Sequence, residues 1–352
     1  MMITTNKCSL YIATKRLITI SILMLFLYTG ITFASEPKLV HAVRTDHVRI
    51  DGILDEDTWQ HEGTNAFTQS DPTDGGSPSE KTSVWIAYDE KAIYIGARLY
   101  DSQPDRIIGL LGRRDEMVDS DWFMVALDPY FSRHSGYQFG VNPRGSIMDM
   151  TLFNDSRQDL TWDGIWESAA RINNEGWIVE IKIPFHQLRF KKKKEYIWGI
   201  NFQRIIKRKN ESVIYAWRPR EETGFVSRFA QLVGIKDIRS GTHLEVLPYS
   251  VGKLALNSSE KGINLRSKKD LSANAGMDIK YNLRSNLIFD FSINPDFGQV
   301  EVDPAVINLT EAETYYPEKR PFFIEGSNLL NFGRGGASYI SAFWQVPTFL
   351  QP

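Results

Sequence analysis

Apolar and polar positions alternate in short runs over most of the chain, and residues 119–149 show this pattern best. In residues 122–127 both alternating sets of side chains are apolar, which predicts a strand buried on both faces of a packed sheet. A turn at Asp128-Pro129 and a polar loop lead to a second apolar run at 137–141, and another turn leads to a third from residue 147. The pattern predicts an antiparallel hairpin followed by a third strand.

The same short pattern recurs on both sides of this stretch. Strands 82–88 and 92–100 form one predicted hairpin, and strands 166–172 and 177–183 form another around a turn whose Asn and Gly suit positive φ. Further strands are predicted at 48–53, 197–206, 213–217 and 229–235, with short helical turns at 55–59 and 184–188. This order predicts an all-β protein with an immunoglobulin-like or jelly-roll-like β-sandwich over residues 35–240.

A different pattern begins at residue 241. Residues 277–283 and 287–293 alternate strictly between apolar and polar side chains, and 243–256 predicts an earlier strand that Pro248 weakens. Apolar-out, polar-in strands joined by a tight turn are typical of an outer-membrane β-barrel, although an amphipathic hairpin on a soluble sheet gives the same periodicity. A barrel needs at least about eight strands. The region 241–352 supplies three or four and a long loop at 297–326, so we expect an incomplete β-barrel from a truncated gene product.

The N-terminal 34 residues have the layout of a secretory signal peptide. Lys7, Lys15 and Arg16 precede an apolar run at 17–28, and residues 32–34 resemble a cleavage site before Ser35. A transmembrane anchor is the alternative, but the run is shorter than the ~20 residues that spanning needs. The protein is therefore predicted to be exported.

Composition excludes several function classes. The formal net charge is −2 over 352 residues, which gives no electrostatic footprint for nucleic acid. The one cysteine, Cys8, lies in the signal segment, so the mature chain has no disulfide and no thiolate chemistry. The sequence contains no HExxH, GxSxG or P-loop motif, and we predict no cofactor and no catalytic residue.

Several motifs occur in an order that resembles a known family. IDGILDEDTW, TSVWIAYDEKAIYIGARLYD, DSDWFMVALD and WESAARINNEGWIVEIKIPFHQL resemble the family 9 carbohydrate-binding modules, over about residues 40–238. RRDEMVDSDWF and YQFGVNPRG resemble a subgroup at the front of bacterial outer-membrane proteins. NPDFGQVEVDPAVINLTEAETYYPEKRPFFIEG, at 294–326, resembles the barrel family of unassigned function that follows in that subgroup.

The resemblance implies a β-sandwich that binds carbohydrate. In the family two tryptophans sandwich a sugar, and their positions fall near Val118 and Thr223–Gly224, none of which is aromatic. A glutamate and an arginine that bind hydroxyls in the family fall at Met124 and Gly140. The ligand set that the resemblance implies is thus largely missing from this chain.

Other residues offer the chemistry of sugar recognition. Aromatic faces stack on the C–H face of a pyranose, and amides, carboxylates or arginine reach its hydroxyls. We predict that Trp162 and Trp166 carry the stacking, although they could instead plug the end of the sandwich. The polar residues predicted with them are Asn154, Arg157, Asp159 and Asp163.

A second predicted cluster lies around the RRD motif. It comprises Arg113, Arg114 and Asp115 with Asp119, Asp121 and Trp122. This cluster could be an ion-pair network, a ligand rim or a cation site. Calcium needs six or more oxygens, which this spacing alone does not supply, so no metal is predicted.

Two basic tracts have no role in this scheme. Residues 191–194 are four lysines, and residues 207–209 are Lys-Arg-Lys. Solvated hairpin loops explain both. The alternative is contact with phosphates on lipopolysaccharide or with an anionic polymer.

These observations lead to one predicted function and two alternatives. The protein is predicted to be an exported, non-catalytic glycan-binding sandwich, attached to outer-membrane lipid through barrel strands and serving glycan binding or uptake. The first alternative is a barrel-associated transport or structural protein whose sandwich is a plug or a partner-binding domain. A carbohydrate-active hydrolase is the second, because carboxylates are abundant although none lies in a catalytic motif.

Overall fold

The computed structural model describes residues 38–239, 243–256, 269–284 and 287–294. The predicted signal peptide and the loop predicted at 297–326 lie outside the described residues, as do the residues on which the predicted chain truncation rests. Among the described residues, no helix is long and apolar enough to cross a membrane.

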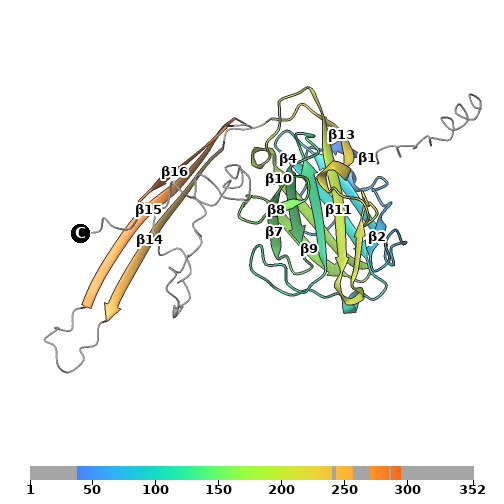
Figure 1. The fold of residues 1–352 in the computed structure, drawn as a ribbon, viewed down its shortest axis with the longest axis horizontal. Helices are drawn as coiled ribbons and strands as arrows, with labels where there is room; N and C mark the ends of the chain where they lie inside the picture. Colours follow the sequence, from blue (N-terminus) through green and yellow to red (C-terminus); the bar gives the residue numbers. More distant parts are fainter. Residues whose placement is uncertain (1–37, 240–242, 257–268, 285–286, 295–352) are drawn as a thin grey trace, which may run out of the picture. The chain divides into compact units, whose positions relative to one another are not determined.

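The first part of the chain, residues 38–239, forms one curled sheet of 13 strands (Figure 1). The main strand order is β8-β7-β6-β5-β11-β13-β1-β3-β4-β10-β9, and β12 and β2 extend from β11. The strands are β1 (Leu39–Arg44), β2 (Thr68–Asp71), β3 (Thr82–Tyr88), β4 (Ala92–Tyr100), β5 (Trp122–Asp128), β6 (Gly136–Val141), β7 (Ile147–Phe153), β8 (Arg157–Asp159), β9 (Glu167–Asn173), β10 (Gly176–Pro184), β11 (Glu195–Ile206), β12 (Glu211–Ile214) and β13 (Ala230–Lys236).

Strand β1 turns this sheet into two layers. Residues 39–41 pair in parallel with β13, and residues 42–44 pair in parallel with β3. The first layer therefore contains β5–β8, β11 and β13, and the second contains β3, β4, β9 and β10. Apolar side chains from both layers form the main core, which among the described residues runs from Val40 to Ile238. A core closed within these residues confirms an all-β fold consistent with the predicted β-sandwich.

Strand β5 is buried along its whole length, as its sequence predicted. Phe123, Val125 and Leu127 enter the main core between the layers. Met124 and Ala126 point the other way and join a second apolar cluster on the outer face of the first layer. Val226 and Phe229, from the segment before β13, cover this outer cluster.

The predicted hairpins are confirmed, one predicted strand is wrong, and another has different bounds. The pairs β3–β4, β5–β6 and β9–β10 are antiparallel as predicted. The strand predicted at 48–53 is wrong, because Val48 packs on the outer face of the second layer while the Asp51 and Gly52 N–H groups donate to the Glu180 side chain. The strand predicted at 213–217 is β12, which ends at Ile214. The short helical turns lie at Asp57–Trp59 and Phe185–Gln187.

A separate antiparallel sheet of three strands follows in the described residues. Its strands are β14 (His243–Leu256), β15 (Lys269–Arg284) and β16 (Leu287–Ile293), which confirms the three strands predicted there. Paired residues share a face, and one face is apolar. That face carries Leu244, Val246, Met277, Ile279, Tyr281, Phe289, Phe291 and Ile293.

The opposite face of this sheet is largely polar. Glu245 pairs with Lys280, and Lys280 pairs with Asp290, so opposite charges alternate across the three strands. Next to them the Ser292 hydroxyl donates to Asp278 at 2.7 Å. The predicted alternation is therefore present in the structure, while membership of these strands in a barrel stays a prediction.

Candidate functional site

Three of the predicted site residues meet at a buried carboxylate, Asp149 on β7. The Asp149 side chain is fully buried and accepts hydrogen bonds from Trp166 Nε1 at 2.6 Å and from Gly164 N at 3.1 Å. Arg114 forms an ion pair with Asp149 and a second one with Asp163 at 2.9 Å. Arg114 also donates to the Gly164 carbonyl at 2.6 Å. The structure thus brings Arg114, Asp163 and Trp166 together around a residue that the sequence pattern did not single out.

The electrostatics of this cluster are those of an ion-pair network. Burial raises the pKa of Asp149, against the lowering effect of the Trp166 hydrogen bond and the Arg114 charge. Burial also raises the pKa of Asp115, to about 6, although Asp115 accepts the Asp149 N–H at 2.9 Å. Among the described residues, no group of three or more potential ligands is placed to hold a metal ion. Of the three interpretations of the RRD cluster, the ion-pair network is the one that these contacts support.

The predicted stacking residues are not surface platforms. Trp162 and Trp166 are buried in the main core, with 9% and 7% of their surface exposed. The Phe139 ring packs edge-on against both, at centroid distances of 5.9 and 5.3 Å, and Tyr137 lies 5.0 Å from Trp162. These contacts match the alternative in which the tryptophans plug the end of the sandwich. In this structure neither ring is available to stack on a sugar.

The remaining predicted residues are spread over several turns. Asp159 accepts hydrogen bonds from the Thr161 hydroxyl at 2.7 Å and from its N–H at 3.0 Å. Asn154 has a positive φ of 48° between β7 and β8, Arg157 is exposed on β8, and the Arg113 N–H donates to Glu116. Each has a local structural setting, and their ligand-binding role stays a prediction.

Asp121 and Trp122 are buried at the start of β5. Trp122 Nε1 donates to the Val118 carbonyl at 3.0 Å, and Asp121 accepts the Lys207 N–H at 2.9 Å. Burial raises the pKa of Asp121 to about 6, although the Lys207 hydrogen bond and the Arg204 charge oppose this. Arg204 is fully buried, and its guanidinium donates to the Tyr100 carbonyl at 2.7 Å. This region is a buried polar joint between the layers rather than an open rim.

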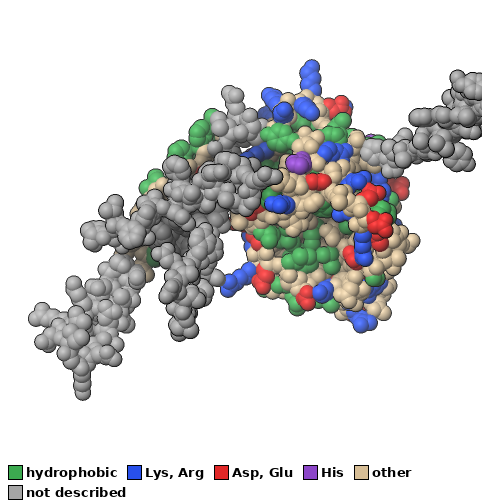
Figure 2. Space-filling model, viewed as in Figure 1, with side chains coloured by type: hydrophobic (Ala, Val, Ile, Leu, Met, Phe, Trp, Pro, Cys, Tyr) green, Lys and Arg blue, Asp and Glu red, His purple; other side chains and the backbone are tan. Residues whose placement is uncertain are grey.

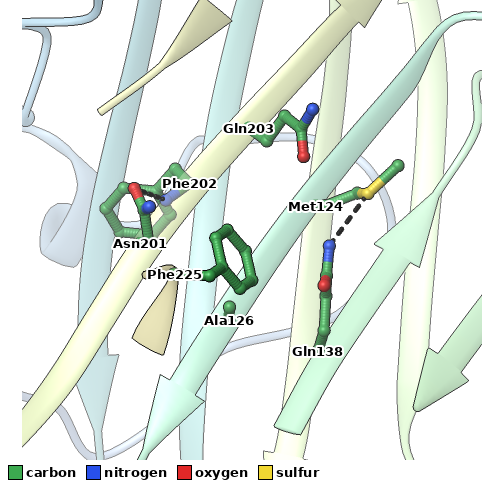
Figure 3. Close-up of a pocket in the computed structure, with 7 residues that line it drawn as sticks. All are labelled: Met124, Ala126, Gln138, Asn201, Phe202, Gln203 and Phe225. Carbon is green, nitrogen blue, oxygen red and sulfur yellow. Dashed lines mark hydrogen bonds between the residues drawn. The ribbon is translucent and has the colours of Figure 1, made fainter. Parts of the chain in front are cut away.

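A hollow lies elsewhere in the described residues, on the outer face of the first layer (Figure 3). Two cross-strand rows form its floor: Gln203 on β11 pairs with Met124 on β5, and Asn201 pairs with Ala126, which pairs with Gln138 on β6. Phe225 lies over this floor from the segment before β13. The hollow therefore combines amide side chains with one aromatic wall.

Gln138 is the polar group in this hollow that lacks a full set of partners. Its side chain is 4% exposed, and its Nε2 approaches the Met124 sulfur at 3.1 Å. Its Oε1 is buried and has no hydrogen-bond partner. The Asn201 amide oxygen, by contrast, accepts the Ala216 N–H at 2.8 Å. An unpartnered buried acceptor is unfavourable by about 1–3 kcal/mol, so Gln138 Oε1 is suited to accept a hydrogen bond from a ligand.

Carboxylates hold both ends of the segment that covers the hollow, residues 219–229: Asp71 and Asp74 bind Arg220, and Asp155 binds the end that carries Phe225. Asp155 accepts hydrogen bonds from Phe225 N at 3.0 Å, Ser227 N at 2.8 Å and the Ser227 hydroxyl at 3.0 Å. Burial raises the pKa of Asp155, but the hydrogen bonds from Ser227 and Phe225 outweigh it and hold the pKa below its usual value. Phe225 also packs edge-on against Phe229 at 5.1 Å. We call residues 219–229 the covering loop.

The positions to which the family resemblance assigns sugar contacts gather around this hollow. Met124 and Gly140 are direct cross-strand partners, and Val118 packs against the cluster that contains Met124. Thr223 and Gly224 immediately precede Phe225. A Cβ on Gly140 would lie 2.6 Å from Met148 Cγ, so methionine fills the space that a longer side chain would need. In this chain these positions hold valine, methionine, glycine and threonine, and the hollow beside them is lined by methionine, amides and phenylalanine.

Comparisons with known proteins give one family match and several structural neighbours. Residues 240–337, less than a third of the chain, match the domain of unknown function DUF5916. No curated protein sequence matches.

Three solved structures are similar to part of this chain. Two are structures of a family 9 carbohydrate-binding module from Caldicellulosiruptor kristjanssonii. The complex with cellotriose has 17% identity, a TM-score of 0.38 and coverage of 56% of this chain and 93% of that one. The glucose complex has 17% identity, a TM-score of 0.40 and coverage of 58% and 100%. A third, described as a putative carbohydrate-binding protein from Bacteroides uniformis ATCC 8492, has 14% identity, a TM-score of 0.39 and coverage of 56% and 99%. Similarity at this level carries no conclusion about ligand.

Proposed function

We propose that this protein is an exported, non-catalytic β-sandwich that binds a saccharide and is joined to strands of an outer-membrane barrel. The observation that carries the saccharide proposal is the buried, unpartnered Oε1 of Gln138 in a hollow with Phe225 as a wall. Sugar hydroxyls donate to such amide oxygens, while the C–H face of the ring packs on an aromatic side chain.

Binding at this hollow requires the covering loop to move. The hollow has a volume of about 10 Å³, which suits one water molecule and is far too small for a pyranose. Phe225 covers the hollow, and Asp155 holds Phe225 in place through a hydrogen bond. Phe225 belongs to a loop rather than to a strand. Surface loops open at lower free energy than core strands, so the loop is the part of this site that yields to a ligand.

The chemistry of the hollow favours binding without hydrolysis. A glycoside hydrolase needs two carboxylates across the bound sugar, about 5–9.5 Å apart. The described residues that line the hollow are Met124, Ala126, Gln138, Asn201, Phe202, Gln203 and Phe225. Amides can orient hydroxyls, but they neither protonate a leaving group nor activate water at neutral pH.

The membrane part of the proposal rests on the sheet of β14, β15 and β16. Phe291 and Ile293 on its apolar face are 53% and 54% exposed, and Leu244 is 58% exposed. Large exposed apolar faces are unfavourable in water and are what a transmembrane strand presents to lipid. The polar face with its row of alternating charges suits a water-filled barrel interior.

A binding screen tests the saccharide proposal. Residues 36–240 contain the whole described core and are screened against plant and microbial polysaccharides, with cellotriose as the first soluble probe. We expect saturable binding, and Phe225→Ala should weaken it by roughly 30-fold, as the loss of an aromatic anchor worth ~2 kcal/mol does. Tyr130→Ala, on a loop between β5 and β6, is the matched control and should bind normally.

No binding by the folded wild type would overturn the saccharide proposal. The alternative would then be the sandwich as a plug or partner-binding domain, which the closed state of the hollow would suit. Hydrolysis of an aryl glycoside would contradict the non-catalytic part.

A further inference from the structure

The loop between β10 and β11 carries the highest local charge of the sandwich. Residues 185–194 contain five Lys or Arg side chains and no acidic one, namely Arg189 and Lys191–Lys194. All five are exposed. Among the described residues, none of the four lysine ammonium groups forms an ion pair or a hydrogen bond. Figure 2 shows Lys and Arg side chains projecting from the uppermost end of the sandwich, close to where β13 lies in Figure 1.

Two acids at this end of the sandwich, Glu195 and Glu90, are paired with cations from outside the tract. Glu195, the residue after the tract, pairs with Lys236 at 3.2 Å. Glu90 pairs with Arg239 at 3.4 Å and with Arg44 at 3.6 Å. The lysine tract therefore keeps an uncompensated positive charge, with self-repulsion that the fold does not relieve.

The second basic tract is different, because the fold uses it. Lys207 pairs with Asp119 at 2.6 Å, and Lys209 pairs with Glu80 at 2.5 Å. Arg208 contacts both Asp101 and Glu80, and its side chain is 11% exposed. Residues 207–209 thus have acidic partners, whereas the ammonium groups of residues 191–194 have none among the described residues.

The tract is held in place by the core below it. Phe190 on one side and Tyr196 on the other are both buried and pack edge-on, with ring centroids 5.5 Å apart. Phe190 also packs against Trp198 at 5.5 Å, and the Lys193 N–H donates to the Tyr196 hydroxyl at 3.2 Å. The backbone that carries the lysines is thus fixed. Binding through these lysines therefore costs less conformational entropy than binding through a flexible tail.

This loop lies at the end of the sandwich from which the chain leaves for β14. Glu195 at the start of β11 pairs with Lys236 at the end of β13, and the Arg239 N–H donates to the Glu90 carbonyl at 2.9 Å. β14 begins at His243. Four residues of extended chain span at most about 14 Å. Strands in a membrane would therefore hold this basic end within reach of the membrane surface.

We propose that Arg189 and Lys191–Lys194 form a docking surface for the phosphate-bearing headgroups of that membrane. This inference rests on the membrane strands of the proposed function. It adds that the basic end of the sandwich faces the lipid. Each lysine close to an anionic surface favours binding by about fivefold, so three lysines contribute on the order of 100-fold. The attraction falls with salt, because the screening length drops from about 10 Å at 0.1 M to about 3 Å at 1 M.

The test compares vesicle flotation of the full chain with two matched variants. In the first variant Lys191, Lys192 and Lys194 are changed to Gln, and Lys193 is kept so that three charges are removed. In the control, three cations elsewhere on the sandwich are changed to Gln: Arg106, Arg144 and Arg171. Both variants lose the same three charges. Vesicles contain either phosphatidylcholine alone or a mixture with 30% phosphatidylglycerol.

We expect wild type to bind the anionic vesicles more tightly than the neutral ones, by about 100-fold at 0.1 M salt, and to lose this difference at 1 M. The lysine variant should lose most of the difference, and the control should keep it. Equal losses in the two variants would overturn the docking surface, as would an anionic preference in wild type that resists 1 M salt. Tighter lysine-dependent binding to soluble dextran sulfate than to the anionic vesicles would also overturn it, in favour of a polyanionic partner.

Two readouts separate this inference from the proposed function. Failure of every protein to float with neutral vesicles counts against the membrane strands. The difference in affinity between anionic and neutral vesicles still tests the role of the lysines. Unchanged tryptophan fluorescence and thermal midpoint show that both variants are folded. If the lysine variant were misfolded, the salt dependence of wild type alone would decide.

Discussion

Removal of the Asp149 carboxylate should destabilise the sandwich far more than removal of Asp163, although both pair with Arg114. Asp149→Ala leaves two buried donors without an acceptor, Trp166 Nε1 and Gly164 N. Each unsatisfied buried donor is unfavourable by about 1–3 kcal/mol. Arg114 is 37% exposed at its side chain and can turn to water, so its lost pair adds only about 0–1 kcal/mol. The expected loss in the free energy of unfolding is about 2–7 kcal/mol.

Asp163→Ala is the matched control on the same arginine. The Asp163 side chain is 60% exposed, and exposed ion pairs contribute about 0–1 kcal/mol. Equilibrium unfolding of residues 36–240 in urea, followed by tryptophan fluorescence, measures both variants. With a denaturant slope of about 2 kcal/mol per molar, Asp149→Ala should lower the midpoint by about 1–3.5 M, and Asp163→Ala by less than about 0.5 M.

Equal midpoints for the two variants would refute this reasoning. That result would mean that Trp166 Nε1 and Gly164 N find water or another acceptor once the carboxylate is gone. The cluster would then be an exposed ion-pair site rather than a buried joint that fixes the edge of the sandwich.

Three further predictions follow from the same structure. Burial raises the pKa of Glu180 from 4.5 to about 7, so the folded state binds this proton more tightly, and the resulting stabilisation is lost as pH rises from about 4.5 to 7. Between pH 5 and 8 the free energy of unfolding, measured in urea, should therefore fall by about 3 kcal/mol less in Glu180→Gln than in wild type. An equal fall in the two proteins would contradict this prediction. Asp155→Ala should speed amide hydrogen exchange at residues 225–227 by about 10-fold or more, because charged hydrogen bonds contribute about 1.5–3 kcal/mol; unchanged protection would show that Asp155 does not hold the covering loop. Mass spectrometry of exported protein should give Ser35 as the first residue, and an intact Met1 would end the signal-peptide prediction.

The strands were predictable because their pattern is local. β3 and β4 were predicted with their observed bounds, since alternation and a three-residue polar turn define a hairpin without knowledge of the rest of the fold. The segment 48–53 shows the limit of this reasoning. Its apolar residues look like a strand, but Val48 packs on the outer face of a sheet and Gly52 N finds a side-chain acceptor, Glu180, 128 positions away.

The site was less predictable, because its contacts are distant in sequence. Arg114 and Trp166 were singled out by residue type, but Asp149, which joins them, lies 35 and 17 positions away. The tryptophans were expected to stack on a ligand, and only the packing of Phe139 shows that core aromatics occupy their faces. Gln138 did carry a signal, since it is the one polar side chain within the apolar run 137–141. The covering loop that buries it could not be derived from any local pattern.

The most direct test of the account is a calorimetric titration of residues 36–240 with the best saccharide from the screen, comparing wild type with Gln138→Met and Gln158→Met. Gln138→Met keeps the side-chain length and removes the unpartnered acceptor, whereas Gln158 is exposed on β8 and serves as the control. We predict that Gln138→Met weakens binding by about 10-fold or more, because a ligand hydroxyl would be left without its acceptor, and that Gln158→Met binds as wild type does. Equal affinity of all three proteins for the saccharide would contradict the assignment of the hollow as the binding site.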